Sequence, residues 1–208
     1  MRTHVYIDGY NLYYGCLKRT PYKWLNIHAL FCALLPKNDI RAIRYFTAQV
    51  SGTPHDPDQP TRQQTYFRAL RTLPQVSIHL GHFLTHEVTM PDAADWQNGR
   101  YTGRQVVKTE EKGSDVNLAT HLLVDAFDDA FDVAVIVSND SDLKEPISVV
   151  RNRFGRNIGI VNPQKRVSRA LKPYADFIKQ IRPGVLKISQ FPDTMRDAKG
   201  QFHKPKRW

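Results

Sequence analysis

The segment Asp132-Val133-Ala134-Val135-Ile136-Val137-Ser138-Asn139-Asp140-Ser141-Asp142 says most about how this chain of 208 residues is built. Its first half is almost wholly apolar and mostly β-branched, which is typical of a strand buried on both faces in the middle of a parallel sheet. Its second half is polar and carries two aspartates directly after the apolar run. The segment therefore predicts a central strand whose C-terminal end presents carboxylates.

The start of the chain has the same design. His4-Val5-Tyr6-Ile7 reads as a buried strand, and it stops at the turn Asp8-Gly9-Tyr10-Asn11. Elsewhere, segments rich in strand formers alternate with segments whose apolar residues recur at helical spacing. Strands are predicted over Ala42–Thr47, Val76–Leu84 and Asn157–Val161, and helices over Leu12–Lys18, Ile27–Leu35, Thr61–Leu73, Ser114–Phe127 and Ser141–Phe154. This alternation predicts an α/β fold, a mainly parallel sheet with helices on both faces.

Several segments lie outside that alternation. A β-hairpin inserted over about residues 85–109 is predicted, with its turn at Asn98-Gly99. Val167–Leu171 is expected to be a short helix and Asp176–Ile181 an edge strand. The chain beyond Pro183 is basic and rich in Pro and Gly, so it is expected to be extended. We therefore predict one domain over residues 1–182 and a basic C-terminal extension over residues 183–208.

Charge is distributed unevenly along the chain. The net charge is +10, but residues 151–208 hold 15 Lys and Arg against 3 Asp, so the whole positive excess lies there. A polyanion is the natural partner, since Lys and Arg neutralise phosphates and release counterions. A solvated tail that only aids solubility is the alternative reading.

Composition also indicates a compartment. No apolar run approaches the roughly 20 residues of a membrane helix, and the N-terminus has no signal-peptide core. Cys16 and Cys32 lie in apolar, helix-like contexts and are predicted to be free thiols. These features predict a cytoplasmic protein.

Four aspartates are predicted to meet at one edge of the sheet. Ligands of such sheets bind at the C-terminal ends of the strands, where the strand order reverses. Asp8 and the pair Asp140 and Asp142 follow two apolar strands, and Asp115 begins a helix that can face the same edge. Each has an ordinary alternative role, as a turn former, an N-cap or a first-turn acid.

Carboxylates gathered this closely need a cation, because otherwise some of them become protonated. Oxygen ligands suit Mg²⁺ or Mn²⁺, and such an ion activates a water and stabilises charge on a phosphate. An acidic pocket and a basic tract together predict metal-dependent phosphodiester chemistry.

Three motifs carry a resemblance to a known family. Ile7-Asp8-Gly9-Tyr10-Asn11-Leu12, Glu111-Lys112-Gly113-Ser114-Asp115-Val116 and Val137-Ser138-Asn139-Asp140-Ser141-Asp142-Leu143 follow one another in family order. Together they resemble NYN domains, a branch of the PIN-like nucleases, and most of all the LabA-like group.

The resemblance implies a three-layer α/β/α sandwich and RNA cleavage that depends on Mg²⁺ or Mn²⁺. It implies that the metal is held by Asp8, Asp115, Asp140 and Asp142, with Asn11 orienting water or phosphate. Lys112, Ser138 and Asn139 would support the site. His121 stands where relatives often have an acid, and its imidazole suits Mn²⁺ better than Mg²⁺; an ordinary surface histidine is the alternative.

RNA contacts are expected from aromatic and basic side chains near the same edge. Tyr10, Tyr13, Tyr14 and Trp24 are candidates for stacking on unpaired bases, with core packing as the alternative. Lys165, Arg166 and Arg169 follow the strand Asn157–Val161 and are candidates for phosphate contacts. The tail Lys204–Trp208 is expected to bind RNA without ordered structure.

Other functions stay open at this stage. The fold is also compatible with an inactive RNA-binding or regulatory protein, and with an acyl-phosphate enzyme that uses one aspartate as nucleophile. A DNA-directed nuclease would use the same metal chemistry, and nothing in the sequence decides whether the chain forms a homodimer.

Overall fold

Strand β5 (Val133–Val137) is buried along its whole length, as its run of branched apolar residues predicts. The computed structural model describes all 208 residues and places β5 beside β1 (Arg2–Asp8), parallel to it. Apolar side chains on both faces of these two strands need cover from both sides. The two strands therefore form the centre of the molecule.

A seven-stranded sheet is built outward from this pair in the order β4-β3-β2-β1-β5-β6-β7. All its strands run parallel except β4, which is antiparallel to β3. The remaining strands are β2 (Asp39–Ala48), β3 (Val76–Pro91), β4 (Gly103–Lys112), β6 (Asn157–Asn162) and β7 (Phe177–Gln180). Because the chain moves outward from β1 to β2 and β3 and returns to β5, the strand order reverses between β1 and β5.

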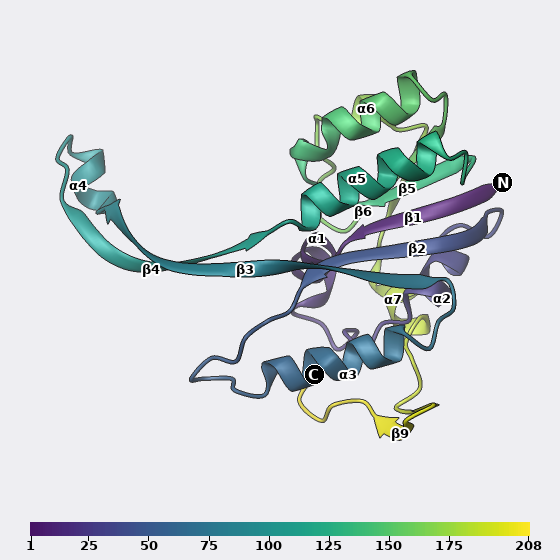
Figure 1. The fold of residues 1–208 in the computed structure, drawn as a ribbon, viewed down its shortest axis with the longest axis horizontal. Helices are drawn as coiled ribbons and strands as arrows, with labels where there is room; N and C mark the ends of the chain where they lie inside the picture. The colour runs from purple at the N-terminus through teal and green to yellow at the C-terminus, as the bar shows by residue number, and fades with distance from the viewer.

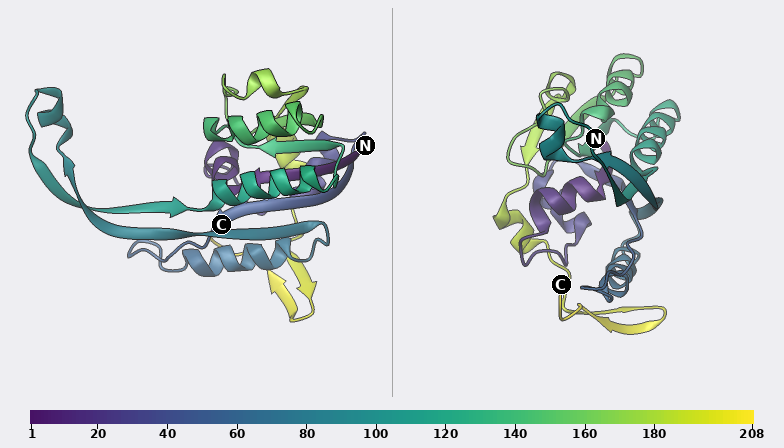
Figure 2. Two further views of the ribbon diagram at one scale, coloured as in Figure 1. Left: turned by 45° about the horizontal axis from the view of Figure 1, so that its top comes forward. Right: turned by 90° about the vertical axis from the view of Figure 1, so that its left-hand side faces the viewer.

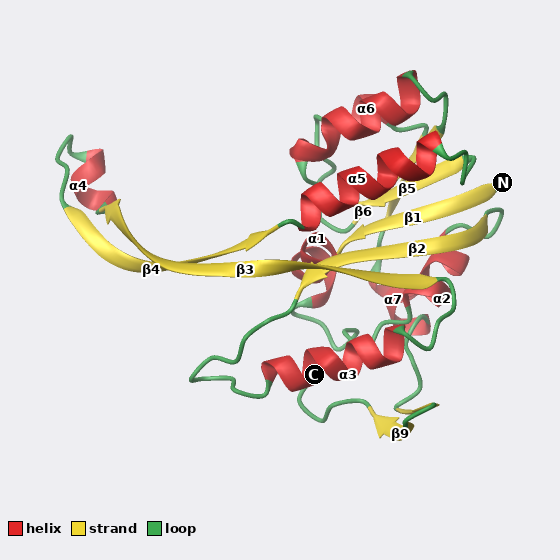
Figure 3. Ribbon diagram, in the orientation of Figure 1, coloured by secondary structure: helices red, strands yellow, loops and turns green.

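Helices cover both faces of the sheet and complete three layers (Figures 1 and 3). α5 (Ser114–Phe127) and α6 (Lys144–Asn152) lie on one face. α2 (Ile27–Leu34), α3 (Gln59–Leu70) and α7 (Pro183–Ile188) lie on the other. Each face has its own apolar core, one around Phe46, Leu118 and Ile136 and the other around Trp24, Phe31 and Phe67. The predicted α/β/α sandwich is confirmed.

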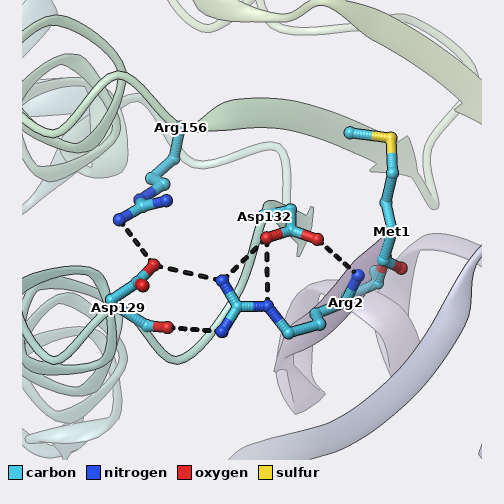
Figure 4. Close-up of polar contacts among 6 residues, drawn as sticks. Met1, Arg2, Asp129, Asp132 and Arg156 are labelled. Atoms are coloured by element: carbon cyan, nitrogen blue, oxygen red, sulfur yellow. Dashed lines mark hydrogen bonds and ion pairs between the residues drawn. The ribbon is translucent and has the colours of Figure 1, made fainter.

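Arg2 joins the N-terminal end of β1 to the loop that leads into β5 (Figure 4). Its guanidinium donates to Asp132 Oδ1 at 2.8 and 3.0 Å and to the carbonyl oxygen of Asp129 at 2.9 Å. Its backbone N–H donates to the other oxygen of Asp132, and Arg156 pairs with Asp129 at 2.7 Å. These contacts fix the relative position of the two strands at the edge opposite Asp8.

Strands β3 and β4 continue past the sheet as a long two-stranded arm that projects from the body (Figures 1 and 2). The predicted hairpin is present, but its predicted turn is wrong. α4 (Ala93–Gln97) connects the strands, and the side chain of Asp92 accepts hydrogen bonds from its first backbone N–H groups. Asn98 and Gly99 end this helix instead of forming a two-residue turn, with Gly99 at a φ of +70°.

The outer part of the arm is expected to contribute little to the stability of the body. Thr85 and Thr109 pair across the arm, with their hydroxyls 3.0 Å apart, and residues beyond them are mostly exposed. Replacing residues 86–108 by Asn-Gly should change the free energy of unfolding by less than about 1 kcal/mol. Urea denaturation measures this, and a loss of several kcal/mol would contradict it.

One other expectation was wrong at the level of local structure. Residues 167–171 form no helix, since Asn139 takes the backbone N–H of Ser168 and the carbonyl of Arg166. The short helix predicted over Leu12–Lys18 is present but begins earlier, and it consists of α1 (Gly9–Leu12) and a π-helix over Tyr13–Leu17. On α5 the buried face is Leu118, Leu122 and Ala126, while Val116 and Phe127 are exposed.

The C-terminal segment is ordered and packs on the body instead of extending from it. Besides α7 it forms a hairpin of β8 (Thr194–Asp197) and β9 (Gly200–His203). Leu186, Phe191 and Phe202 join the apolar core, and Arg68 of α3 pairs with Asp197 at 2.7 Å. The apolar residues of this segment are widely spaced, so they show no helix or strand periodicity from which the docking could be predicted.

Two smaller expectations concern the thiols and the membrane. Cys16 and Cys32 are free, as predicted. No helix combines the length and the apolar character needed to cross a membrane.

Candidate active site

The candidate active site lies at the C-terminal ends of β1 and β5, where the strand order reverses. Ile7 of β1 pairs with Val137 of β5, so the residues that follow each strand leave the sheet side by side. Asp8 comes from β1, and Ser138, Asn139 and Asp140 come from the loop after β5. The predicted convergence of these two segments is present in the structure.

Asp8 is buried, with 4% of its surface exposed, and almost fully hydrogen-bonded. One carboxylate oxygen accepts from the backbone N–H of Asn11 at 2.9 Å. The other accepts from the Asn11 amide at 2.5 Å and from the Ser138 hydroxyl at 3.0 Å. Asp8 thus caps α1 and joins β1 to the loop after β5, so its position is fixed from both sides.

The loop after β5 is held by a chain of side-chain amides. The backbone N–H of Asn139 donates to Asn11 Oδ1 at 3.2 Å, and so does the side-chain amide of Gln164. Asp140 donates its backbone N–H to Ser138 Oγ, and its carboxylate accepts from the backbone N–H of Asp142 at 3.0 Å. Asp140 is therefore also an N-cap, with one of its two carboxylate oxygens engaged.

Asp115 reaches the same edge from the first turn of α5. The turn from β4 into α5 requires a glycine at position 113, where φ is +97°. The turn also packs closely on Gly81, because a Cβ added to Gly81 would lie 2.5 Å from the carbonyl oxygen of Lys112. Glu111 caps the helix, accepting from Ser114 N at 3.1 Å and Ser114 Oγ at 2.6 Å. This packing places Asp115 at the C-terminal edge of the sheet.

The electrostatics show that these carboxylates share one region. Burial raises the pKa of Asp8, and the charge of Asp140 raises it further. Hydrogen bonds from Asn11 and Ser138 lower this pKa but do not cancel the rise. Asp115 is exposed at its outer side, yet the protein beneath it removes enough hydration to raise its pKa to about 6. The charges of Asp8, Asp140, Glu111 and Asp142 add to this rise.

The residues suit a divalent cation chemically, but they do not form a closed coordination shell. The donors are all hard carboxylate oxygens, and Asp115 and Asp142 have side chains without a hydrogen-bonding partner. No three His, Cys, Asp or Glu side chains in the structure lie close enough together to hold a metal ion. Binding would therefore need side-chain rotation at the exposed acids, around a fixed Asp8.

Mutual repulsion is expected to cost stability in the metal-free protein. The pKa of Asp115 is about 6 in the folded state, against roughly 3.9 for an unfolded aspartate, so the folded state holds the proton more tightly between these values. Stability should therefore fall as pH rises through this window. Asp115→Asn should raise the melting temperature at pH 7.5 in EDTA but not at pH 3.5. Asp193→Asn, an exposed control, should have no effect at either pH.

Not every predicted site residue joins the cluster. His121 packs against His79, with ring centroids 4.1 Å apart, and against Phe46. Burial, then the charge of Arg44, lowers the pKa of His121, and none of the four aspartates contributes. The structure therefore places His121 in an aromatic stack and not with the carboxylates. Lys112 is half-exposed and lies 3.4 Å from Glu110.

The predicted RNA-contact residues divide into exposed and buried ones. Lys165, Arg166 and Arg169 are exposed on the loop after β6, which the amide of Asn139 ties to the site. Tyr14 is 61% exposed and stacks on Tyr10 at 6.4 Å. Trp24 is fully buried, so the expectation that it stacks on bases was wrong.

Sequence reasoning missed three polar side chains that shape the site. Buried Asn162, at the end of β6, accepts from the Gln164 backbone N–H and donates to the Gln180 side chain and Gln164 O. Gln164 then reaches Asn11. A polar residue directly after an apolar strand was the available indication, the same one that identified Asp8 and Asp140. Glu111 was quoted in a motif without a role.

Comparison with known proteins gives three findings. The chain is 34% identical to 6-hydroxy-3-succinoylpyridine 3-monooxygenase HspA of Pseudomonas putida (strain DSM 28022 / S16), across this whole chain and 75% of that protein. Its fold resembles the crystal structure of VPA0982, a protein of unknown function from Vibrio parahaemolyticus RIMD 2210633. That likeness has a TM-score of 0.57 at 17% identity, over 88% of this chain and 93% of the other.

The third finding covers most of the domain. The family model of the NYN domain matches residues 2–182, which include β1, β5, α5 and the four aspartates. NYN domains are generally nuclease domains. The chain therefore belongs to the NYN domain family.

Proposed function

We propose that this protein is a nuclease that uses Mg²⁺ or Mn²⁺ to hydrolyse phosphodiester bonds of RNA at the carboxylate cluster. The observation that carries the proposal is the position of Asp8, Asp115, Asp140 and Asp142 at the C-terminal edge of the sheet, where the charges of the other three raise the pKa of Asp115. Family membership supports the same class of reaction.

Each side chain has a distinct proposed role. Asp8 is fixed and buried, so it would anchor the ion, while the exposed carboxylates of Asp115 and Asp142 and the half-buried carboxylate of Asp140 would close around it. The bound ion would lower the pKa of a water and neutralise charge on the phosphate. Asn11 holds Asp8 and the loop after β5 together, and in the proposed reaction it would orient water or phosphate.

The RNA backbone would lie along the basic loop beside the site. Lys165, Arg166 and Arg169 are exposed there and have no carboxylate partner within ion-pair distance. Free Lys and Arg side chains next to a metal centre attract phosphates and bring the scissile bond toward it. Tyr14, exposed at the rim, would stack on an unpaired base.

The test is cleavage of end-labelled RNA, single-stranded and hairpin, and of DNA of the same sequence. Each is incubated with Mn²⁺, Mg²⁺ or EDTA, and the products are sized. We expect RNA cleavage with either metal and none in EDTA. Internal products would indicate an endonuclease, and equal cleavage in EDTA would reject the metal. Absence of cleavage together with RNA binding would favour a catalytically inactive RNA-binding protein.

A second candidate function follows from the identity to the Pseudomonas protein along the whole chain. The name of that protein describes insertion of one oxygen atom into a hydroxylated pyridine. Such a reaction reduces the other atom of O₂ to water, so it needs a two-electron reductant. Incubation with 6-hydroxy-3-succinoylpyridine, O₂ and a reduced nicotinamide, followed by mass spectrometry, tests this candidate. Because position 3 of that ring carries the succinoyl group, oxygen insertion there must release this side chain. Formation of a dihydroxypyridine that carries one atom of isotopically labelled O₂ would support oxygenation.

A further inference from the structure

We propose that a cavity on the α3 side of the sheet binds one planar nitrogen-heteroaromatic ring that carries an anionic group. The cavity has a volume of about 320 Å³, which is the lower end of the range typical of ligand sites. It lies between α1, β2 and α3, and Gly9 and Tyr10 form part of its wall. Of its lining residues, the nuclease proposal uses only Tyr14.

Aromatic side chains form a large part of its walls. Tyr13 and Tyr14 come from the π-helix, Tyr45 from β2, and Tyr66 and Phe67 from α3. Tyr13 and Tyr14 meet edge to face, with centroids 5.2 Å apart. Flat rings pack favourably against such surfaces, face to face or edge to face. The shape and the lining therefore favour an aromatic guest over a flexible aliphatic one.

Two hydrogen-bonding groups at the cavity lack a protein partner, the Tyr45 hydroxyl and the indole N–H of Trp208, and only the second of them is a buried atom. Tyr45 is 7% exposed, and burial, then the charges of Tyr10 and Asp8, raises its pKa without any hydrogen bond to its hydroxyl. Trp208 also lines the cavity, and its buried indole N–H has no partner. Buried polar groups are nearly always paired. A ring nitrogen, carbonyl or hydroxyl of a guest would pair them.

The cavity also carries a positive excess. Lys23, Arg62 and Arg207 line it, and Asp56 is its one acidic residue. Arg62 is occupied by its ion pair with Asp56, which leaves the other two cations free. An anionic substituent on the ring, such as a phosphate or carboxylate, would neutralise them.

The cavity and the carboxylate cluster share the turn after β1. Gly9 packs so closely on the ring of Tyr45 that a Cβ there would lie 2.9 Å from Tyr45 Cζ. Asp8 directly precedes Gly9, and its carboxylate accepts a hydrogen bond from Ser138 in the loop after β5. A ring held in the cavity would therefore lie just across the β1 turn from the metal-binding acids. The ring would be either a base of bound RNA or a free aromatic acid. In the first case this inference rests on the proposed nuclease function.

Calorimetry in EDTA tests the site without any dependence on metal or catalysis. Uridine 5′-monophosphate and 6-hydroxynicotinate are titrated separately and in competition into wild type and Tyr45→Phe, which removes only the unpaired hydroxyl. Tyr101→Phe, on the exposed tip of the arm, is the matched control. We expect Tyr45→Phe to weaken binding about fivefold, the usual effect of one hydrogen bond, and Tyr101→Phe to change nothing. Thermal unfolding confirms that both variants are folded.

The two probes separate the two sources of the ring. Binding of the nucleotide alone assigns the cavity to a nucleobase, binding of the pyridine acid alone assigns it to a free metabolite, and mutual competition shows one shared site. Asp8→Asn should keep ring binding within twofold even where it abolishes cleavage, so failure of the nuclease proposal leaves this one standing. Absence of binding by both probes at 10 mM (an upper limit chosen as about tenfold above weak fragment affinities), or equal binding by Tyr45→Phe, would overturn the proposal.

Discussion

Asp8→Asn is expected to slow metal-dependent RNA cleavage by about a thousandfold. The amide keeps the size of the carboxylate and one acceptor oxygen, so the cap on α1 is largely preserved while the charge that would anchor the ion is lost. A bound metal contributes several kcal/mol to the transition state, and each 1.36 kcal/mol is a factor of ten in rate. Single-turnover rates at saturating Mn²⁺ measure the effect.

Two companion variants make this prediction specific. Asp140→Asn, from the other strand, should have an effect of similar size, since its charge acts on the same region. Asp193→Asn removes an exposed carboxylate in the C-terminal segment and should leave the rate unchanged. Calorimetric titration should show weaker Mn²⁺ uptake by Asp8→Asn and Asp140→Asn only. If wild type and Asp8→Asn cleave equally, the carboxylate cluster is not the active site.

Asp125→Ala is expected to lower the free energy of unfolding by about 3–5 kcal/mol, the usual cost of removing one partner of a buried ion pair. Asp125 is 5% exposed and accepts hydrogen bonds from Arg44 at 2.6 and 2.7 Å and from Tyr6 at 2.6 Å. His4 Nδ1 lies 3.2 Å from it. Alanine would leave the Arg44 guanidinium without its counter-charge between α5 and the sheet. Urea denaturation at pH 7 measures the loss.

The pH dependence gives a second test of the same contact. Burial alone would raise the pKa of Asp125, but hydrogen bonds from His4, Arg44 and Tyr6 outweigh burial and lower the pKa. A depressed carboxylate pKa stabilises the fold above the unfolded value, roughly 3.9, and that stabilisation is lost as pH falls below it. The difference between wild type and Asp125→Ala should therefore shrink in acid. Asp128→Ala, exposed at the end of α5, should cost little at any pH.

Local sequence patterns determined the central strands and the positions of Asp8, Asp115 and Asp140. An apolar, β-branched run can only be a buried strand here, and in a parallel sheet the residue after such a strand lies at the ligand-binding edge. The helices that begin at Ile27 and Ser114 were likewise predicted correctly, because helix starts depend on the nearest few residues. The strand order that brings Asp8 beside Ser138 agrees with this rule.

Only the tertiary structure decided which partners the remaining residues have. Asp125 lies on the buried face of α5 because Arg44 and Tyr6, about 80 and 119 residues away, neutralise it there. The C-terminal segment docks because Phe191 packs against Trp24 and Phe202 against Arg68 of α3, which its composition does not reveal. Local rules follow from short-range sterics and hydrogen bonding, whereas burial of a charge, docking of a tail and the walls of a cavity depend on surfaces supplied by distant parts of the chain.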